Sequence, residues 1–202
     1  MRSTILLLCL ILLTGVSCDQ QTEVEFGPDG PIDRTLLLEH VEVLASDAYM
    51  GRRTGTEGGR LAREYVLARY EEIGLAPACS DSLGQSFSFE NRRYGTLTGT
   101  NFIGKVAGTG SSEGSIIITA HFDHLGDWEG DIFNGADDNA SGTAALIELA
   151  RVLQENPPGH DELFAALDAE EMGLQGARAF VESSCFEASD IRLNLNMDMV
   201  SR

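Results

Sequence analysis

The second half of the chain alternates strand-like and helix-like segments, and this pattern constrains the fold more than any other feature. Residues 115–120 include three consecutive isoleucines, as in a strand buried on both faces. Residues 163–167 and 192–197 are two further strand-like runs. Helical periodicity at residues 145–153 and 173–181 separates the three runs. Such an alternation requires right-handed crossovers and predicts a parallel sheet with helices on its faces.

The first half is expected to supply two more helices and a set of strands. Asp33 can cap a helix that runs to about Ala45, and Thr56 can cap a second helix that stops at Gly74. Residues 85–106 alternate aromatic and small polar side chains and predict strands. In the second half we expect Ser141 to cap the first helix, and we expect the second helix to turn these side chains inward: Leu174, Ala177 and either Phe180 or Val181.

Polar side chains follow each of the three strand-like runs of the second half. His121 and Asp123 follow the first run, Glu170 and Glu171 follow the second, and Asp198 ends the third. In open α/β sheets, ligands bind outside the carboxyl ends of the strands. One acidic residue could lie there by chance, but three separate strands deliver metal-ligand side chains to this edge. The sequence therefore predicts a metal site at this edge.

Histidine and carboxylate ligands without cysteine suit zinc or another divalent first-row metal. His121 is the natural nitrogen ligand, and Asp123 could hold its other ring nitrogen. The acidic loop 134–142 could supply a carboxylate that bridges two metals. Of the adjacent pair Glu170 and Glu171, one can bind metal while the other acts as a general base. Taken singly, each residue could equally be a surface histidine or part of a solvated acidic turn.

Four motifs in this order resemble the zinc aminopeptidase family that includes bacterial leucyl aminopeptidase, aminopeptidase Y and glutamate carboxypeptidase II. A segment at residues 45–58 also looks like the N-terminal segment of that family. The motifs are Ala-His-Phe-Asp-His at 120–124, Gly-Ala-Asp-Asp-Asn-Ala-Ser-Gly at 135–142, Asp-Ala-Glu-Glu-Met-Gly-Leu-Gln-Gly at 168–176 and Asn-Met-Asp-Met at 196–199. The resemblance implies a phosphorylase/hydrolase-like zinc exopeptidase fold, with a mixed, largely parallel central sheet and helices on both faces. It also implies hydrolysis of N-terminal residues from peptides that carry a free N-terminus.

Carried over residue by residue, the resemblance implies a two-zinc site and its catalytic base. It also implies a cis peptide bond after the bridging aspartate, here Asp137–Asp138, and it gives no ligand role to His124. His40 and His160 are expected at the surface. The implied roles are His121 and Asp198 on one zinc, Asp137 bridging both zincs, Glu171 on the second zinc, Glu170 as general base and Asp123 supporting His121.

One departure from the family pattern leaves alternatives open. The second zinc of the family takes a further histidine from the C-terminal part of the domain, and no remaining histidine here matches it. We therefore expect the zinc peptidase domain, residues 33–202, to lack its C-terminal part. The alternatives are an inactive or truncated metal-binding module and a glutaminyl-peptide cyclotransferase, which uses a single zinc.

The N-terminus predicts export. Residues 1–18 have a positive start, a short apolar run and small residues, as in a signal peptide. Cys18 suggests a lipoprotein signal with a lipid anchor, and 19–32 reads as a tether. We therefore expect a cell-envelope lipoprotein or a periplasmic or secreted protein. The net charge of −18 argues against nucleic acid as a partner. Cys79 and Cys185 could form a disulfide or remain two separate thiols.

Overall fold

The computed structural model describes residues 30–110, 114–183 and 187–201. The predicted signal peptide, most of the tether and Cys185 lie outside the described residues; Cys79 is disulfide-bonded. Within the described ranges no helix has the length and apolar character needed to cross a membrane. The elements, in chain order, are α1 (Arg34–Leu44), η1 (Asp47–Arg52), α2 (Glu57–Ile73), β1 (Ala76–Pro77), β2 (Gly84–Asn91), β3 (Gly95–Val106), β4 (Ser115–His121), β5 (Gly126–Trp128), β6 (Asp131–Phe133), η2 (Ala136–Ser141), α3 (Gly142–Glu155), β7 (Asp161–Leu167), α4 (Gln175–Val181), η3 (Ala188–Asp190) and β8 (Ile191–Asn196).

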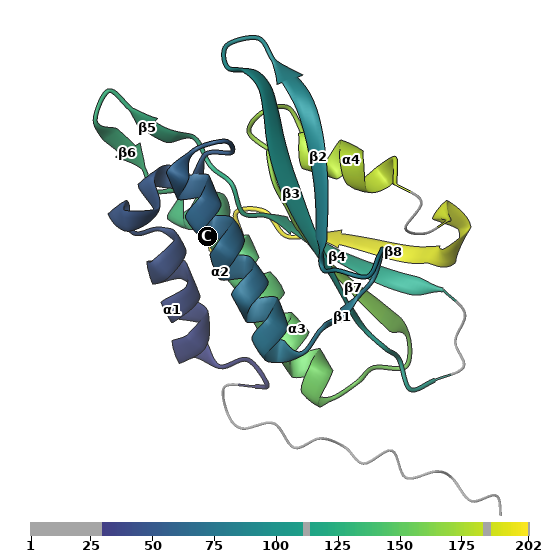
Figure 1. The fold of residues 1–202 in the computed structure, drawn as a ribbon. Helices are drawn as coiled ribbons and strands as arrows, with labels where there is room; N and C mark the ends of the chain where they lie inside the picture. The colour runs from purple at the N-terminus through teal and green to yellow at the C-terminus, as the bar shows by residue number, and fades with distance from the viewer. Residues whose placement is uncertain (1–29, 111–113, 184–186, 202) are drawn as a thin grey trace, which may run out of the picture.

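A mixed six-stranded sheet forms the centre of the molecule, in the order β1-β3-β7-β4-β8 with β2 paired to β3. Strand β4 runs parallel to both β7 and β8, whereas β3 runs antiparallel to β7. The expectation of a mixed sheet is therefore confirmed, but the sheet is parallel only at β7-β4-β8 and not for the most part, because β1, β2 and β7 all pair antiparallel with β3. Because β4, β7 and β8 are parallel, their carboxyl ends meet at one edge of the sheet (Figure 1).

Helices cover both faces of this sheet. Alternate strand residues point to opposite sides, so Ile118 and Phe164 belong to one core cluster while Ile117 and Leu163 belong to another. The core that contains Ile118 and Phe164 packs against α1, α2 and α3, and the core that contains Ile117 and Leu163 includes Phe180 of α4 (Figure 1). Burial of these apolar side chains fixes the register of the strands and with it the position of their carboxyl ends.

The helix termini agree in part with the capping residues predicted. The Asp33 carboxylate accepts backbone N–H bonds at the start of α1, and Gly74 ends α2 at φ 78°, a conformation that glycine adopts without strain. Ser141 does not cap α3; its hydroxyl donates to the Asp137 carbonyl. The inward position of Leu174 is also wrong: it precedes α4 and is exposed, whereas Phe180 of that helix is buried.

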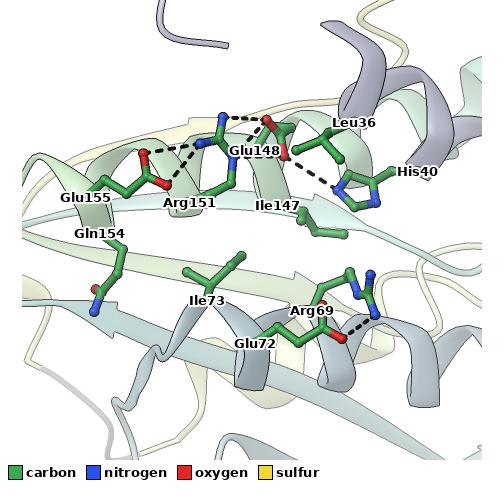
Figure 2. Close-up of a pocket in the computed structure, with 10 residues that line it drawn as sticks. All are labelled: Leu36, His40, Arg69, Glu72, Ile73, Ile147, Glu148, Arg151, Gln154 and Glu155. Carbon is green, nitrogen blue, oxygen red and sulfur yellow. Dashed lines mark hydrogen bonds and ion pairs between the residues drawn. The ribbon is translucent and has the colours of Figure 1, made fainter. Parts of the chain in front are cut away.

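The three helices on one face enclose a pocket of about 300 Å³ (Figure 2). Glu148 of α3 is buried there, where Arg151 donates to it and the His40 Nε2 atom of α1 lies 3.6 Å from Glu148 Oε1. The His40 Nδ1 atom lies 2.6 Å from the Tyr65 hydroxyl. His40 is therefore buried and not at the surface as predicted, because α1 packs against both neighbouring helices. His160 is half-buried.

Glu162 is an acidic side chain buried within β7, and its pH dependence can be tested. Burial, with the nearby charge of Asp161, raises the pKa of Glu162 from 4.5 to about 7. Because the pKa is raised in the folded state, the contribution of this carboxyl to the free energy of unfolding is fully present below about pH 4.5. That contribution is lost as the pH rises through about 7. Glu162→Gln should therefore raise the free energy of unfolding at pH 8 by up to about 3 kcal/mol, and by much less at pH 5.

Denaturant unfolding at the two pH values measures this effect. Asp161→Asn is the matched control, because Lys105 pairs with Asp161 and holds the pKa of that carboxyl below its usual range. That substitution should bring no net gain at pH 8, because it removes the ion pair with Lys105 along with the charge beside Glu162. Equal stability of Glu162→Gln and the unchanged protein at pH 8 would contradict the assignment.

Candidate metal centre

The carboxyl ends of β4 and β8 and the η2 loop bring three metal-binding side chains together. His121 ends β4, Asp198 follows β8, and Asp138 lies in η2. The His121 Nε2 atom lies 3.3 Å from Asp138 Oδ1 and 3.6 Å from Asp198 Oδ1. The three ligand atoms, one from each residue, all lie within 4.8 Å of one another, and His121 is buried. We call this group the first cluster.

A second cluster lies on the other side of Asp138. It consists of His124, Asp138 and Glu171, which comes from the turn after β7. The His124 Nδ1 atom lies 2.7 Å from Glu171 Oε1 and 3.9 Å from Asp138 Oδ2. Both His124 Nδ1 and Glu171 Oε1 are buried, and neither has hydrogen-bond geometry with a partner in the described ranges. Buried polar atoms are rarely left without a hydrogen-bond partner, so these two converging ligand atoms fit a site for a cation.

Asp138, and not Asp137, is the carboxylate that the two clusters share. Asp137 turns away, and its Oδ1 atom accepts bonds from the backbone N–H and the hydroxyl of Ser201 at 3.3 and 2.5 Å. The cis peptide bond is correspondingly one residue later than predicted, between Asp138 and Asn139. The prediction of a cis link at Asp137–Asp138 is wrong because the η2 loop directs the second aspartate of the pair, not the first, toward His121 and His124.

Asp123 holds both the histidine and the loop that carries the glutamates. The His121 Nδ1 atom lies 3.2 Å from the Asp123 carbonyl oxygen and 3.5 Å from its Oδ1 atom. The two carboxylate oxygens accept the backbone N–H groups of Glu170 at 2.9 Å and Glu171 at 3.2 Å. This buried residue thus lies against the imidazole through its carbonyl and its carboxylate, and its carboxylate also fixes the turn after β7.

Glu170 belongs to neither cluster in the described residues, although its electrostatic neighbours are the cluster residues. Burial raises the pKa of the Glu170 carboxyl above its usual range, and the neighbouring charges of Asp123 and Glu171 add to the rise. A half-buried carboxyl beside the ligands, and not among them, is suited to accept and release a proton.

The first cluster holds a proton where a cation would bind. Burial alone disfavours a charged imidazole, but Asp123, Glu170 and Asp198 raise the pKa of His121 to about 9. The surrounding carboxylates therefore require positive charge at this point. A divalent metal ion satisfies the same requirement, because metal ligands bind in their deprotonated form and metal binding releases protons.

Two supporting residues were not assigned a role from the sequence. The buried Arg52 donates to the carbonyls of Phe122 and Gly135, which lie directly beside the ligand-bearing segments. Asn139 joins the η2 loop to the end of β8: its Nδ2 donates to the Met197 carbonyl at 3.0 Å, and its Oδ1 accepts the Met199 N–H. Arg52 lies in the segment 45–58 and Asn139 in the motif 135–142, but only the fold shows what they contact.

A family model described as Peptidase family M28 matches residues 101–202. Aminopeptidase YwaD of Bacillus subtilis is 38% identical over 86 residues, which cover 42% of this chain and 18% of that protein. The alkaline phosphatase isozyme conversion protein of Escherichia coli is 29% identical over 164 residues, covering 74% of this chain and 47% of that protein. The probable lipoprotein aminopeptidase LpqL of Mycobacterium tuberculosis is 39% identical over 95 residues, covering 46% and 18%. The chain therefore spans less than half the length of each of these relatives.

Solved structures with the same fold include enzymes of two kinds. A glutaminyl cyclase of Porphyromonas gingivalis superposes with a TM-score of 0.69 at 20% identity, covering 84% of this chain and 60% of that one. A leucine aminopeptidase precursor of Bacteroides thetaiotaomicron gives 0.67 at 20% identity, covering 84% and 63%. At this identity the likeness shows the fold alone, and it confirms the expected exopeptidase-type α/β architecture.

Proposed function

Because this chain belongs to peptidase family M28, we propose that it is a zinc-dependent metallopeptidase that removes N-terminal residues from peptides at a two-zinc site. The observation that carries the proposal is the pair of ligand clusters that share Asp138, with Glu170 beside them. The names of the relatives support zinc and peptide substrates, since they include an aminopeptidase and a probable zinc metalloprotease.

In this proposal His121, Asp138 and Asp198 hold one zinc, and His124, Asp138 and Glu171 hold the other. Asp138 replaces Asp137 as the bridging ligand because its two oxygens face the two histidines. Bound zinc supplies a water molecule of lowered pKa and polarises the scissile carbonyl. In this proposal His124 is the nitrogen ligand of the second cluster, so that cluster does not need the expected C-terminal histidine for this purpose.

The protein's own residues then position and move the proton. Glu170 takes the proton of the attacking water and returns it to the leaving amine. Asp123 keeps His121 in one orientation and holds the Glu170 backbone, so the base cannot swing away from the ligands. The acidic cluster attracts the free α-amino group of the substrate, and this attraction favours exopeptidase action over cleavage within a chain.

Metal content and product analysis of the full-length gene product test the proposal. Leucine p-nitroanilide should be hydrolysed and its N-acetyl form should not, with about two zinc ions per chain. A single zinc, with glutaminyl peptides converted to pyroglutamyl products, would instead support the cyclotransferase. No bound metal and no turnover would support an inactive module. We also propose export, with Cys18 as a lipid anchor; the name of the lipoprotein relative supports this.

The second cluster gives a prediction that metal analysis can check. Glu171→Gln and His124→Gln should each lower the zinc content from about two to about one per chain after dialysis, because both side chains face the same site. His160→Gln is the matched control, since it removes a histidine distant from the clusters. Unchanged occupancy in either cluster variant would remove that residue from the site.

A further inference from the structure

A second pocket, of about 230 Å³, adjoins the second cluster and contains an unusual concentration of positive charge. His124 and Glu171 are among the residues that line it, so the pocket shares two side chains with the proposed metal site. Two arginines, Arg53 and Arg93, also line the pocket, with Tyr94 and Trp128. These residues come from segments far apart in the sequence: the end of η1, the turn between β2 and β3, and strand β5.

The two guanidinium groups are held in place by aromatic rings. The Arg53 Cζ atom lies 4.7 Å from the centroid of the Tyr94 ring, and Arg53 Nη1 donates to the Tyr94 hydroxyl at 2.8 Å. The Arg93 Cζ atom lies 4.3 Å from the centroid of the Trp128 ring. Stacking of this kind fixes the plane of a guanidinium and leaves its N–H edge available to a partner.

The local backbone also accommodates this arrangement. A Cβ atom at Gly126 would lie 2.8 Å from the Arg53 Cβ, so glycine leaves room for the arginine stem at a residue whose φ is 89°. The Asn91 Oδ1 atom accepts the backbone N–H groups of Arg93 and Tyr94 at 2.9 and 3.2 Å and fixes the turn that carries them. The pocket is therefore assembled by specific contacts.

Neither arginine forms an ion pair with a carboxylate in the described part of the chain. In this chain of net charge −18, other arginines do pair with carboxylates, as Arg60, Arg69 and Arg151 do. Two adjacent guanidinium groups in a pocket repel each other unless an anion lies between them. A carboxylate is the complementary group, because it accepts bidentate hydrogen bonds from arginine.

We propose that Arg53 and Arg93 form a subsite that binds a carboxylate of the peptide substrate. The inference rests on the proposed peptidase function and names a substrate class for it. The carboxylate could be the side chain of an acidic residue or the C-terminus of a dipeptide. Both are anions of the same chemistry at a short distance from the scissile bond.

Paired substrates that differ only in this charge distinguish the two sources. Glutamyl p-nitroanilide is compared with glutaminyl p-nitroanilide, and Leu-Gly is compared with Leu-Gly amide, using the zinc-loaded full-length gene product. We expect at least about a tenfold higher kcat/KM for the acid in one of the two pairs, mainly through KM. Calorimetric titration with glutamate and glutamine, which are products of the first pair, measures the same preference without turnover.

Arg53→Gln and Arg93→Gln should each reduce that ratio toward one, and Arg93 is exposed, so its variant keeps the test independent of folding defects. Arg92→Gln is the matched control: it is exposed on the same turn and does not line the pocket, and it should leave the ratio unchanged. Equal rates for acid and amide in both pairs, with equal binding of glutamate and glutamine, would overturn the subsite while leaving the peptidase function intact. Failure to hydrolyse any neutral substrate would count against the peptidase function, and the titration would still decide on the subsite.

Discussion

The Glu170→Gln variant is expected to keep both metals and to have a kcat lower by a factor of about 10²–10⁴, the usual contribution of a positioned general base. Glu170 lies beside the ligands without belonging to either cluster, so its amide should leave metal binding intact. The amide preserves the shape of the side chain and the backbone N–H bond to Asp123, but it cannot accept a proton. Metal analysis and steady-state kinetics on the same preparation measure the two quantities separately.

A second glutamate variant is the control for this prediction. Glu171→Gln, one residue later, should lose metal as well as activity, because Glu171 belongs to the second cluster. If Glu170→Gln turned over at a near-normal rate, the base would have to be another group. If it lost a metal instead, Glu170 would be a ligand and the roles of the two glutamates would need to be exchanged.

The sheet and its functional edge could be predicted because buried strands have a simple sequence pattern. The buried apolar runs of β4 and β7 lie where the residue pattern placed them, as does β8, an exposed strand in which leucines alternate with polar residues. The parallel order followed from the intervening helices. Since polar residues directly follow these strands, the meeting of His121, Glu171 and Asp198 at one edge could be anticipated. Regular periodicity thus predicted both the architecture and the location of the candidate site.

The choice between adjacent side chains could not be predicted in the same way. In the η2 loop, Asp138 at φ −105° and ψ 97° and Asn139 at φ −132° and ψ 46° depart from helical geometry. Irregular dihedrals determine which carboxylate faces the histidines, and no periodicity reports them. His124 had no assigned role for a related reason: it follows β4 in a loop, and only tertiary packing brings it to Glu171.

Contacts between distant segments were equally invisible in the sequence. His40 was expected at the surface, but it is buried because α1 packs against α2 and α3. The pairing of Arg53 with Tyr94 and of Arg93 with Trp128 joins three segments that share no local motif. Side chains whose environment comes from long-range packing are therefore the ones that sequence patterns predict least well.

The Asp138→Asn variant is expected to impair both metal sites at once, which no other single substitution in the clusters should do. Asp138 is the member common to both, and an amide is a weaker metal ligand than a carboxylate. Altering a group that merely supports a ligand already costs about 10–100-fold in metal affinity or activity. Loss of the shared ligand should therefore exceed that range in kcat/KM and lower the zinc content well below about one per chain.

Asp137→Asn is the matched control, because it makes the same chemical change one residue earlier in the same loop. Its carboxylate bonds to Ser201 and lies outside both clusters, so this variant should keep most of its zinc. Zinc titration of the two variants followed by metal analysis, with circular dichroism to confirm equal folding, separates the candidates. A protein that lost both metals on Asp137→Asn and kept them on Asp138→Asn would restore Asp137 as the bridging ligand. Loss of only one metal on Asp138→Asn would mean that the two sites do not share a carboxylate.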